Sequence, residues 1–144
     1  MSTPKLLVQF DVDSTFIQQE AIELLAAKAG VFDQVSKVTE SAMRGELDFA
    51  QSLIARVALL KDLPESVIAE VQQEIVLTDG AAELVQQLHA KGHFVSLVSG
   101  GFINIIKPLI DQLPPGYRID IGGAVEESSK GQMSIMAGMP IMLF

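Results

Sequence analysis

The sequence predicts an α/β protein in which helices pack against a parallel sheet. Two short apolar runs, residues 5–10 and 94–98, have the length and composition of buried strands, and turn residues follow each of them. The stretches between and after these runs carry apolar residues at helical spacing. Strands that alternate with helices pair in parallel, so the carboxyl ends of the two strands should meet at one edge of the sheet, where ligands bind in such folds.

The first predicted strand leads directly into two carboxylates that stand one residue apart, in Asp11-Val12-Asp13-Ser14-Thr15. Carboxylate oxygens are the ligands that Mg²⁺ prefers, and a carboxylate beside a metal can attack phosphorus. The same residue types are also common in turns that cap helices. The motif by itself leaves both interpretations open.

The roughly 60 residues between Phe16 and Thr78 are mostly helical in pattern and exceed what one crossover needs. They therefore predict a helical cap inserted after the first strand, over residues 17–77, with an α/β core formed by residues 1–16 and 78–144. Gly30 is a stop signal, Asp48 an N-cap and Pro64 a first-turn residue. The predicted helices cover about residues 18–30, 32–44, 49–60, 64–74 and 78–91.

The second predicted strand ends in Ser99-Gly100-Gly101. A hydroxyl and glycine amides at the start of a helix can hold a phosphate, since the helix N-terminus presents free N–H groups. A plain strand-to-helix turn is the alternative, and pairing with the two aspartates favours the phosphate site. The following helix should run from Phe102 to about Leu113, with a kink or break at Pro108.

Composition excludes several classes of site. The chain of 144 residues has no cysteine and two histidines, which excludes disulfides and argues against a zinc site. A net charge of −8 argues against nucleic-acid binding. No run approaches the roughly 20 apolar residues of a membrane span, although mean hydropathy is +0.35. The start of the chain lacks the apolar region of a secretory signal, so we expect a cytoplasmic protein.

The charges suggest roles for the two aspartates. Asp11 is expected to be the more buried one and to act as the nucleophile. Asp13 would protonate the leaving alkoxide and then deprotonate water. Mg²⁺, held by Asp11 and Asp13, would offset the repulsion between a carboxylate and a phosphate.

These motifs resemble those of the phosphoserine phosphatases in the haloacid dehalogenase superfamily. The resemblance lies in Phe10-Asp11-Val12-Asp13-Ser14-Thr15, in Val98-Ser99-Gly100-Gly101-Phe102, and in two cap segments, residues 42–49 and 52–57. It covers residues 5 to about 113. It implies a Rossmann-like parallel sheet with a helical cap, and Mg²⁺-dependent hydrolysis of L-phosphoserine through an aspartyl-phosphate on Asp11, the last step of serine biosynthesis.

The resemblance also implies roles for individual residues. Glu20 would meet the substrate ammonium and Arg56 its carboxylate, while Ser99 and Gly100 would bind phosphate. Arginine suits a planar carboxylate because it forms two parallel hydrogen bonds. Met43 and Phe49 would line the cap side of the pocket. Without the resemblance, the cap residues are equally typical of solvated helix faces and ordinary core.

The C-terminal region departs from the family pattern. Lys130 is the candidate for the family's phosphate-neutralising lysine, but a surface lysine is nearly as good an interpretation. The acidic loop that completes the family's metal site has no counterpart, so we expect the core to be incomplete there. The apolar residues 139–144 look like a strand or helix from inside a core. A shortened enzyme, completion by a second copy or another protein, and a catalytically silent phosphate-binding relative all remain open.

The sequence therefore predicts a phosphatase for a small phosphorylated substrate, with phosphoserine the favoured one and another phosphometabolite the alternative. The sequence is also compatible with a homodimer.

Overall fold

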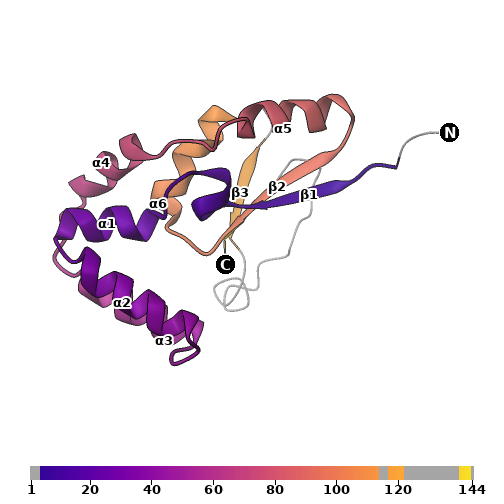
Figure 1. Cartoon of the computed structure of the whole chain (residues 1–144). Helices are drawn as coiled ribbons and strands as arrows, with labels where there is room; N and C mark the ends of the chain where they lie inside the picture. The colour runs from indigo at the N-terminus through magenta and orange to yellow at the C-terminus, as the bar shows by residue number, and fades with distance from the viewer. Residues whose placement is uncertain (1–3, 114–116, 122–139, 144) are drawn as a thin grey trace.

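The computed structural model describes residues 4–113, 117–121 and 140–143. In this part of the chain, four parallel strands form one sheet in the order β1-β2-β4-β3. Figure 1 shows β1 and β2 side by side. The α/β class predicted from the sequence is confirmed. The strands are β1 (Leu7–Asp11), β2 (Phe94–Ser99), β3 (Arg118–Ile121) and β4 (Pro140–Leu143).

The two strands predicted from the sequence are β1 and β2, which pair from Leu7↔Phe94 to Asp11↔Val98. The apolar segment 139–144, expected as a strand or a helix, contains β4. The sequence did not predict β3, because a four-residue strand gives too little alternation for a pattern to be read.

The predicted helices are present with their ends shifted by a few residues. Pro108 breaks the helix after β2 as expected: a short α-helix gives way to a 3₁₀ segment, η2, one residue before the proline. The fourth helix begins two residues after Pro64. The helices are α1 (Ala21–Ala29), α2 (Phe32–Met43), α3 (Phe49–Leu59), α4 (Ser66–Glu74), α5 (Ala81–Ala90) and α6 (Ile103–Ile106), with η2 at Lys107–Gln112.

Asp48 is the N-cap of α3, as the sequence predicts. Its side chain accepts a hydrogen bond from the Gln51 backbone N–H at 2.8 Å, and the Gln51 side chain accepts one from the Asp48 N–H at 3.0 Å. This reciprocal capping box satisfies two N–H groups that have no partner within the helix.

One face of the sheet is covered by α5 and by the α6–η2 segment. Val95 and Leu97 of β2 point to this face and are fully buried against Val85 of α5 and Leu109 of η2. Phe10 packs on the same cluster from β1. Because side chains alternate along a strand, the neighbours of these residues point to the opposite face.

The opposite face is open at β1 in the described part of the chain. Leu7 is 65% exposed, and its partner Phe94 is 48% exposed. Asp11 lies on this face because it is four residues from Leu7. The prediction of a buried first strand is therefore wrong: in the described part of the chain, only one face of β1 is covered.

Helices α1 to α4 form a group beyond the ends of β1 and β2 (Figure 1). They have cores of their own, one around Leu25 and Val71 and another around Ala26 and Val35. Phe102, which follows β2, packs against both clusters and thereby joins the sheet to the helical group. No helix in the described residues is both long and apolar enough to cross a membrane.

Two connecting segments join this helical group to the rest of the chain, and they run antiparallel to each other. Ile17 and Leu77 form a β-bridge, the Gln18 N–H donates to the Val76 carbonyl at 2.9 Å, and the Thr78 N–H donates to the Phe16 carbonyl at 2.9 Å. The chain therefore enters and leaves the helical group through one pair of neighbouring segments. That this group is a separate cap over residues 17–77 stays a prediction.

Replacing Asp48 should show how much the capping box contributes. We expect Asp48→Ala to lower the free energy of unfolding by about 1 kcal/mol, because a Gln51 N–H loses its partner. Urea unfolding followed by circular dichroism measures this. Glu65→Ala is the matched control, since Glu65 is the N-cap of α4 but makes no capping hydrogen bond. Equal losses in both variants would contradict the prediction.

Candidate functional site

The candidate site lies at the carboxyl ends of β1 and β2. The two strands are paired up to Asp11↔Val98, so Asp11 and Ser99 end at the same edge of the sheet. After Asp11 the chain enters the turn η1 (Val12–Phe16), in which Ser14 has a left-handed φ of 53°. The turn reverses the chain and places the Asp13 side chain toward β2.

Asp13 is held by hydrogen bonds to both of its oxygens. Its Oδ1 accepts from the backbone N–H of Ala21, the first residue of α1, at 2.8 Å. Its Oδ2 accepts from the Ser99 hydroxyl at 3.2 Å. The Ser99 oxygen in turn accepts from the Gly101 N–H at 2.9 Å. One carboxylate therefore links the ends of β1 and β2 and the start of α1, so the two motifs found in the sequence meet in space.

Asp11 is exposed and Asp13 is half-buried. This reverses the prediction that Asp11 is the more buried of the two. The physical reason is that Asp11 is on the open face of the edge strand β1, whereas Asp13 turns inward between β2 and α1. An exposed Asp11 is reachable by a substrate that approaches this edge.

Glu20 lies within the electrostatic field of both aspartates. Burial raises the pKa of the Glu20 carboxyl above its usual range, a hydrogen bond from the Ser14 side chain opposes this, and the charges of Asp13, Glu23 and Asp11 raise it further. The structure thus brings Glu20 near Asp11 and Asp13, and the negative charge at this position is unfavourable until a cation offsets it.

Arg56 is half-buried in α3, where its Nε donates to the Ser52 carbonyl of the same helix at 3.3 Å. Met43 and Phe49 stand on either side of the turn between α2 and α3 and are 85% and 66% exposed. In this arrangement neither side chain lines a closed pocket. Figure 1 shows the α2–α3 hairpin extending away from α1, and that Met43 and Phe49 line the site stays a prediction.

The other predicted phosphate-binding residues are placed only in part. Gly100 is exposed in the turn between β2 and α6, directly after Ser99. Lys130 lies outside the described residues. That Ser99 and Gly100 bind phosphate stays a prediction.

The oxygen ligands at this edge suit a hard divalent cation. Asp11 and Asp13 supply carboxylates, and Mg²⁺ completes its coordination with water when the protein supplies few ligands. Within the described ranges, no group of three or more histidine, cysteine, aspartate or glutamate side chains is close enough to hold a metal. The described residues therefore offer Asp11 and Asp13 as oxygen ligands, and that they hold Mg²⁺ stays a prediction.

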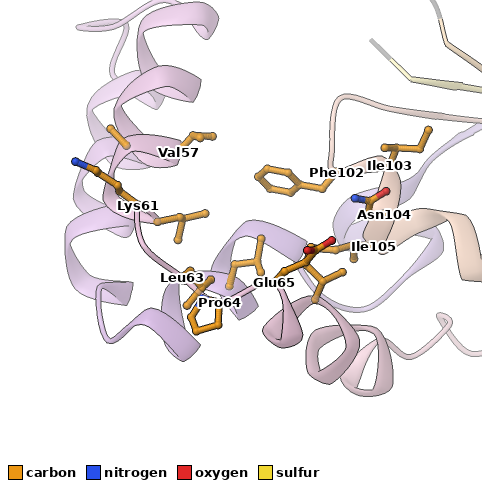
Figure 2. Close-up of a pocket in the computed structure, with 13 residues that line it drawn as sticks. Val57, Lys61, Leu63, Pro64, Glu65, Phe102, Ile103, Asn104 and Ile105 are labelled. Atoms are coloured by element: carbon orange, nitrogen blue, oxygen red, sulfur yellow. The ribbon is translucent and has the colours of Figure 1, made fainter.

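An apolar cavity of about 580 Å³ is lined in part by Phe102, which follows the Ser99–Gly101 turn (Figure 2). It separates the end of α3 and the following loop from the β2–α6 connection, and Phe102 points into it from the sheet side. No sequence pattern predicted this cavity, because its walls come from segments far apart in the chain. Its lining includes Val57, Leu60, Leu63, Ile68, Phe102 and Ile105, and the predicted site residues are absent from it.

The fold and the paired motifs define a class of protein. The family model of the haloacid dehalogenase-like hydrolases matches residues 6–132. The chain belongs to this family.

Within the family, the chain is similar to phosphoserine phosphatases. It is 54% identical to the phosphoserine phosphatase of Streptococcus thermophilus over 117 residues, which are 81% of this chain and 54% of that protein. The corresponding enzyme of Lactococcus lactis is 50% identical over 113 residues, 78% of this chain and 52% of the relative. The phosphoserine phosphatase of Methanocaldococcus jannaschii is 37% identical, with 92% of this chain and 70% of the relative covered.

Solved structures agree with this likeness. A phospho-aspartyl intermediate analogue of a phosphoserine phosphatase superposes with a TM-score of 0.71 at 41% identity, covering 77% of this chain and 53% of that chain. A substrate-bound phosphoserine phosphatase gives a TM-score of 0.70 at 40% identity, covering 76% and 52%. The chain spans about half the length of the first two relatives and of these structures.

The raised pKa of Glu20 leads to a stability prediction. We expect Glu20→Gln to raise the melting temperature by about 2 °C at pH 7, because the variant loses a half-buried charge near two other carboxylates. The difference should shrink as pH falls through the raised pKa, since the folded wild-type chain then binds the proton as well.

Thermal unfolding between pH 4 and 8 measures this effect. Glu83→Gln is the control and should gain nothing, because Glu83 is exposed in the first turn of α5 and its charge does not act on Glu20. A Glu20→Gln variant that is less stable at pH 7 than at pH 4, relative to wild type, would contradict the prediction.

Proposed function

We propose that this chain carries the catalytic centre of a Mg²⁺-dependent phosphatase that hydrolyses L-phosphoserine to serine and phosphate. The observation that carries the proposal is the junction of two motifs, in which the Ser99 hydroxyl lies 3.2 Å from Asp13 Oδ2 at the edge where Asp11 is exposed. The similarity to phosphoserine phosphatases supports the choice of substrate.

In the first step, a carboxylate oxygen of Asp11 attacks the phosphorus of the substrate. The bond from phosphorus to the seryl oxygen breaks, and Asp13 gives that oxygen a proton, so that serine leaves and the phosphoryl group stays on Asp11. In the second step, water attacks this phosphorus while Asp13 takes a proton from the water. The bond to Asp11 then breaks and releases phosphate.

The surroundings of Asp13 suit both steps. The Ala21 N–H holds Oδ1, which fixes the carboxyl group in place. The Ser99 hydroxyl has a single proton, which it can give either to Oδ2 or to a phosphate oxygen. When Ser99 turns to the phosphate, Oδ2 becomes free to carry the proton that the leaving group needs.

The remaining roles follow from the chemistry of phosphoserine. Glu20 would accept the ammonium, Arg56 would bind the carboxylate, and Ser99 and Gly100 would hold the phosphate. Asp11 and Asp13 would hold Mg²⁺, which would neutralise charge on the phosphate. Lys130 would add a second positive charge, and Met43 and Phe49 would close over the substrate after movement of the α2–α3 hairpin. The cap over residues 17–77, the cytoplasmic location and a role in serine biosynthesis belong to the same proposal.

The first test is phosphate release from L-phosphoserine by the 144-residue chain, with and without Mg²⁺. We expect Mg²⁺-dependent release, and a loss of at least about 1,000-fold in Asp11→Asn because the amide is no nucleophile. Asp33→Asn, in the first turn of α2, is the matched control and should keep full activity. Appreciable turnover by Asp11→Asn would exclude Asp11 as the nucleophile.

The described residues contain no group of three or more side chains that could hold a metal. This favours a second candidate, a phosphate-binding protein without turnover. Calorimetry with phosphoserine separates the two. Binding by a folded chain that releases no phosphate would support this candidate over the phosphatase.

Replacing Arg56 tests whether the substrate carries a carboxylate beside its phosphate. We expect Arg56→Gln to lower kcat/KM for phosphoserine by about 10- to 100-fold, because a hydrogen bond to a charged group contributes roughly 1.5–3 kcal/mol. Turnover of an aromatic phosphate, which has no carboxylate beside the phosphate, should fall less than about threefold. Lys61→Gln is the control cation. Equal losses on both substrates would mean that Arg56 has a structural role.

A further inference from the structure

We propose that Gly101 is a positioning residue for Asp13, which it holds in place through Ser99. This inference rests on the proposed function, in which Asp13 transfers the protons. The sequence motifs point to Ser99 and Gly100 as phosphate ligands, whereas the geometry assigns a separate task to the second glycine.

The first observation is a chain of hydrogen bonds. The Gly101 N–H donates to the Ser99 oxygen at 2.9 Å, and the Ser99 hydroxyl donates to Asp13 Oδ2 at 3.2 Å. Because the oxygen of Ser99 already accepts from Gly101, its one proton is directed outward, to Asp13 in this arrangement. Gly101 therefore fixes the oxygen of Ser99 whichever acceptor the hydroxyl then serves.

The second observation is the absence of space for a side chain at Gly101. A Cβ atom at this position would lie 3.0 Å from Asp13 Oδ2, 3.0 Å from Ser99 Oγ and 3.1 Å from Ile106 Cδ1. Ile106 is fully buried in the core under the sheet, so it cannot move away easily. The carboxylate of Asp13 and the hydroxyl of Ser99 would have to move instead.

The backbone conformation gives no other reason for a glycine here. Four other glycines of the described chain have φ between 71° and 81°, where L-residues are strained, and Gly101 is not one of them. Close approach to Asp13 and Ser99 is thus what the glycine permits. A shift of a few tenths of an ångström in Asp13 matters, because proton transfer needs short, aligned contacts.

Kinetics with L-phosphoserine provide the first test. We expect Gly101→Ala to lower kcat by at least about 10-fold while KM changes less than about threefold, since proton transfer is disturbed more than binding. Gly92→Ala is the control: its φ of 78° makes alanine strained, and it lies in the turn before β2, at the opposite end of that strand. A kcat of Gly101→Ala within twofold of wild type would overturn the proposal.

The second test needs no turnover and so separates this proposal from the proposed function. It follows the backbone amide resonance of Ala21, which reports on its hydrogen bond to Asp13 Oδ1. We expect this resonance to shift in Gly101→Ala and in Ser99→Ala, and to stay near its wild-type position in Ser99→Thr, which keeps the hydroxyl.

Ser96→Ala is the control, and it measures how far the Ala21 resonance moves when a buried hydroxyl of β2 is removed that does not contact Asp13. Ser96 is equally buried, lies three residues earlier in β2, and its hydroxyl has no hydrogen-bond partner in the described part of the chain. If the Ala21 resonance in Gly101→Ala moves no more than in Ser96→Ala, Gly101 does not position Asp13, whether or not the wild-type chain releases phosphate.

Discussion

The half-buried carboxylate of Asp13 is the contact on which the arrangement of this edge depends. It accepts a hydrogen bond from the first turn of α1 on one oxygen and from the end of β2 on the other. Hydrogen bonds to an ionised acceptor are stronger than those between neutral groups. Because the aspartate itself follows β1, the ends of β1 and β2 and the start of α1 are fixed around one side chain. The same contact connects the helical group α1–α4 to the sheet, in addition to the paired connections at Ile17 and Leu77.

The features that the sequence predicted correctly are local ones. A strand followed by Asp-x-Asp, a strand followed by Ser-Gly-Gly, the N-cap at Asp48 and the break at Pro108 each depend on a few neighbouring residues. Backbone sterics and capping decide such features within one or two turns. The meeting of the two motifs could also be predicted, because parallel strands place their carboxyl ends at one edge.

The features that the sequence missed depend on what covers each element. Residues 5–10 have the composition of a buried strand, yet Leu7 is exposed because no described element covers that face of the sheet at β1. The order of burial of Asp11 and Asp13 follows from the same cause. Met43 and Phe49 are apolar and resemble pocket residues, but their exposure depends on where the α2–α3 hairpin stands relative to the sheet. No local sequence pattern encodes the position of the hairpin. The cavity beside Phe102 depends on the same position, because residues of α3 form part of its wall.

The electrostatics of the edge explain why a cation would have to act with the substrate. The chain has a net charge of −8, and at this edge the charges of Asp13 and Asp11 add to the effect of burial in raising the pKa of Glu20. A phosphate group alone would be repelled from such an edge. An ammonium group near Glu20 and a divalent cation near the aspartates would each relieve the repulsion among the carboxyl groups. The same negative edge would therefore discriminate against phosphate esters that carry no positive charge, and it would favour a substrate in which an ammonium group and a phosphate belong to one small molecule.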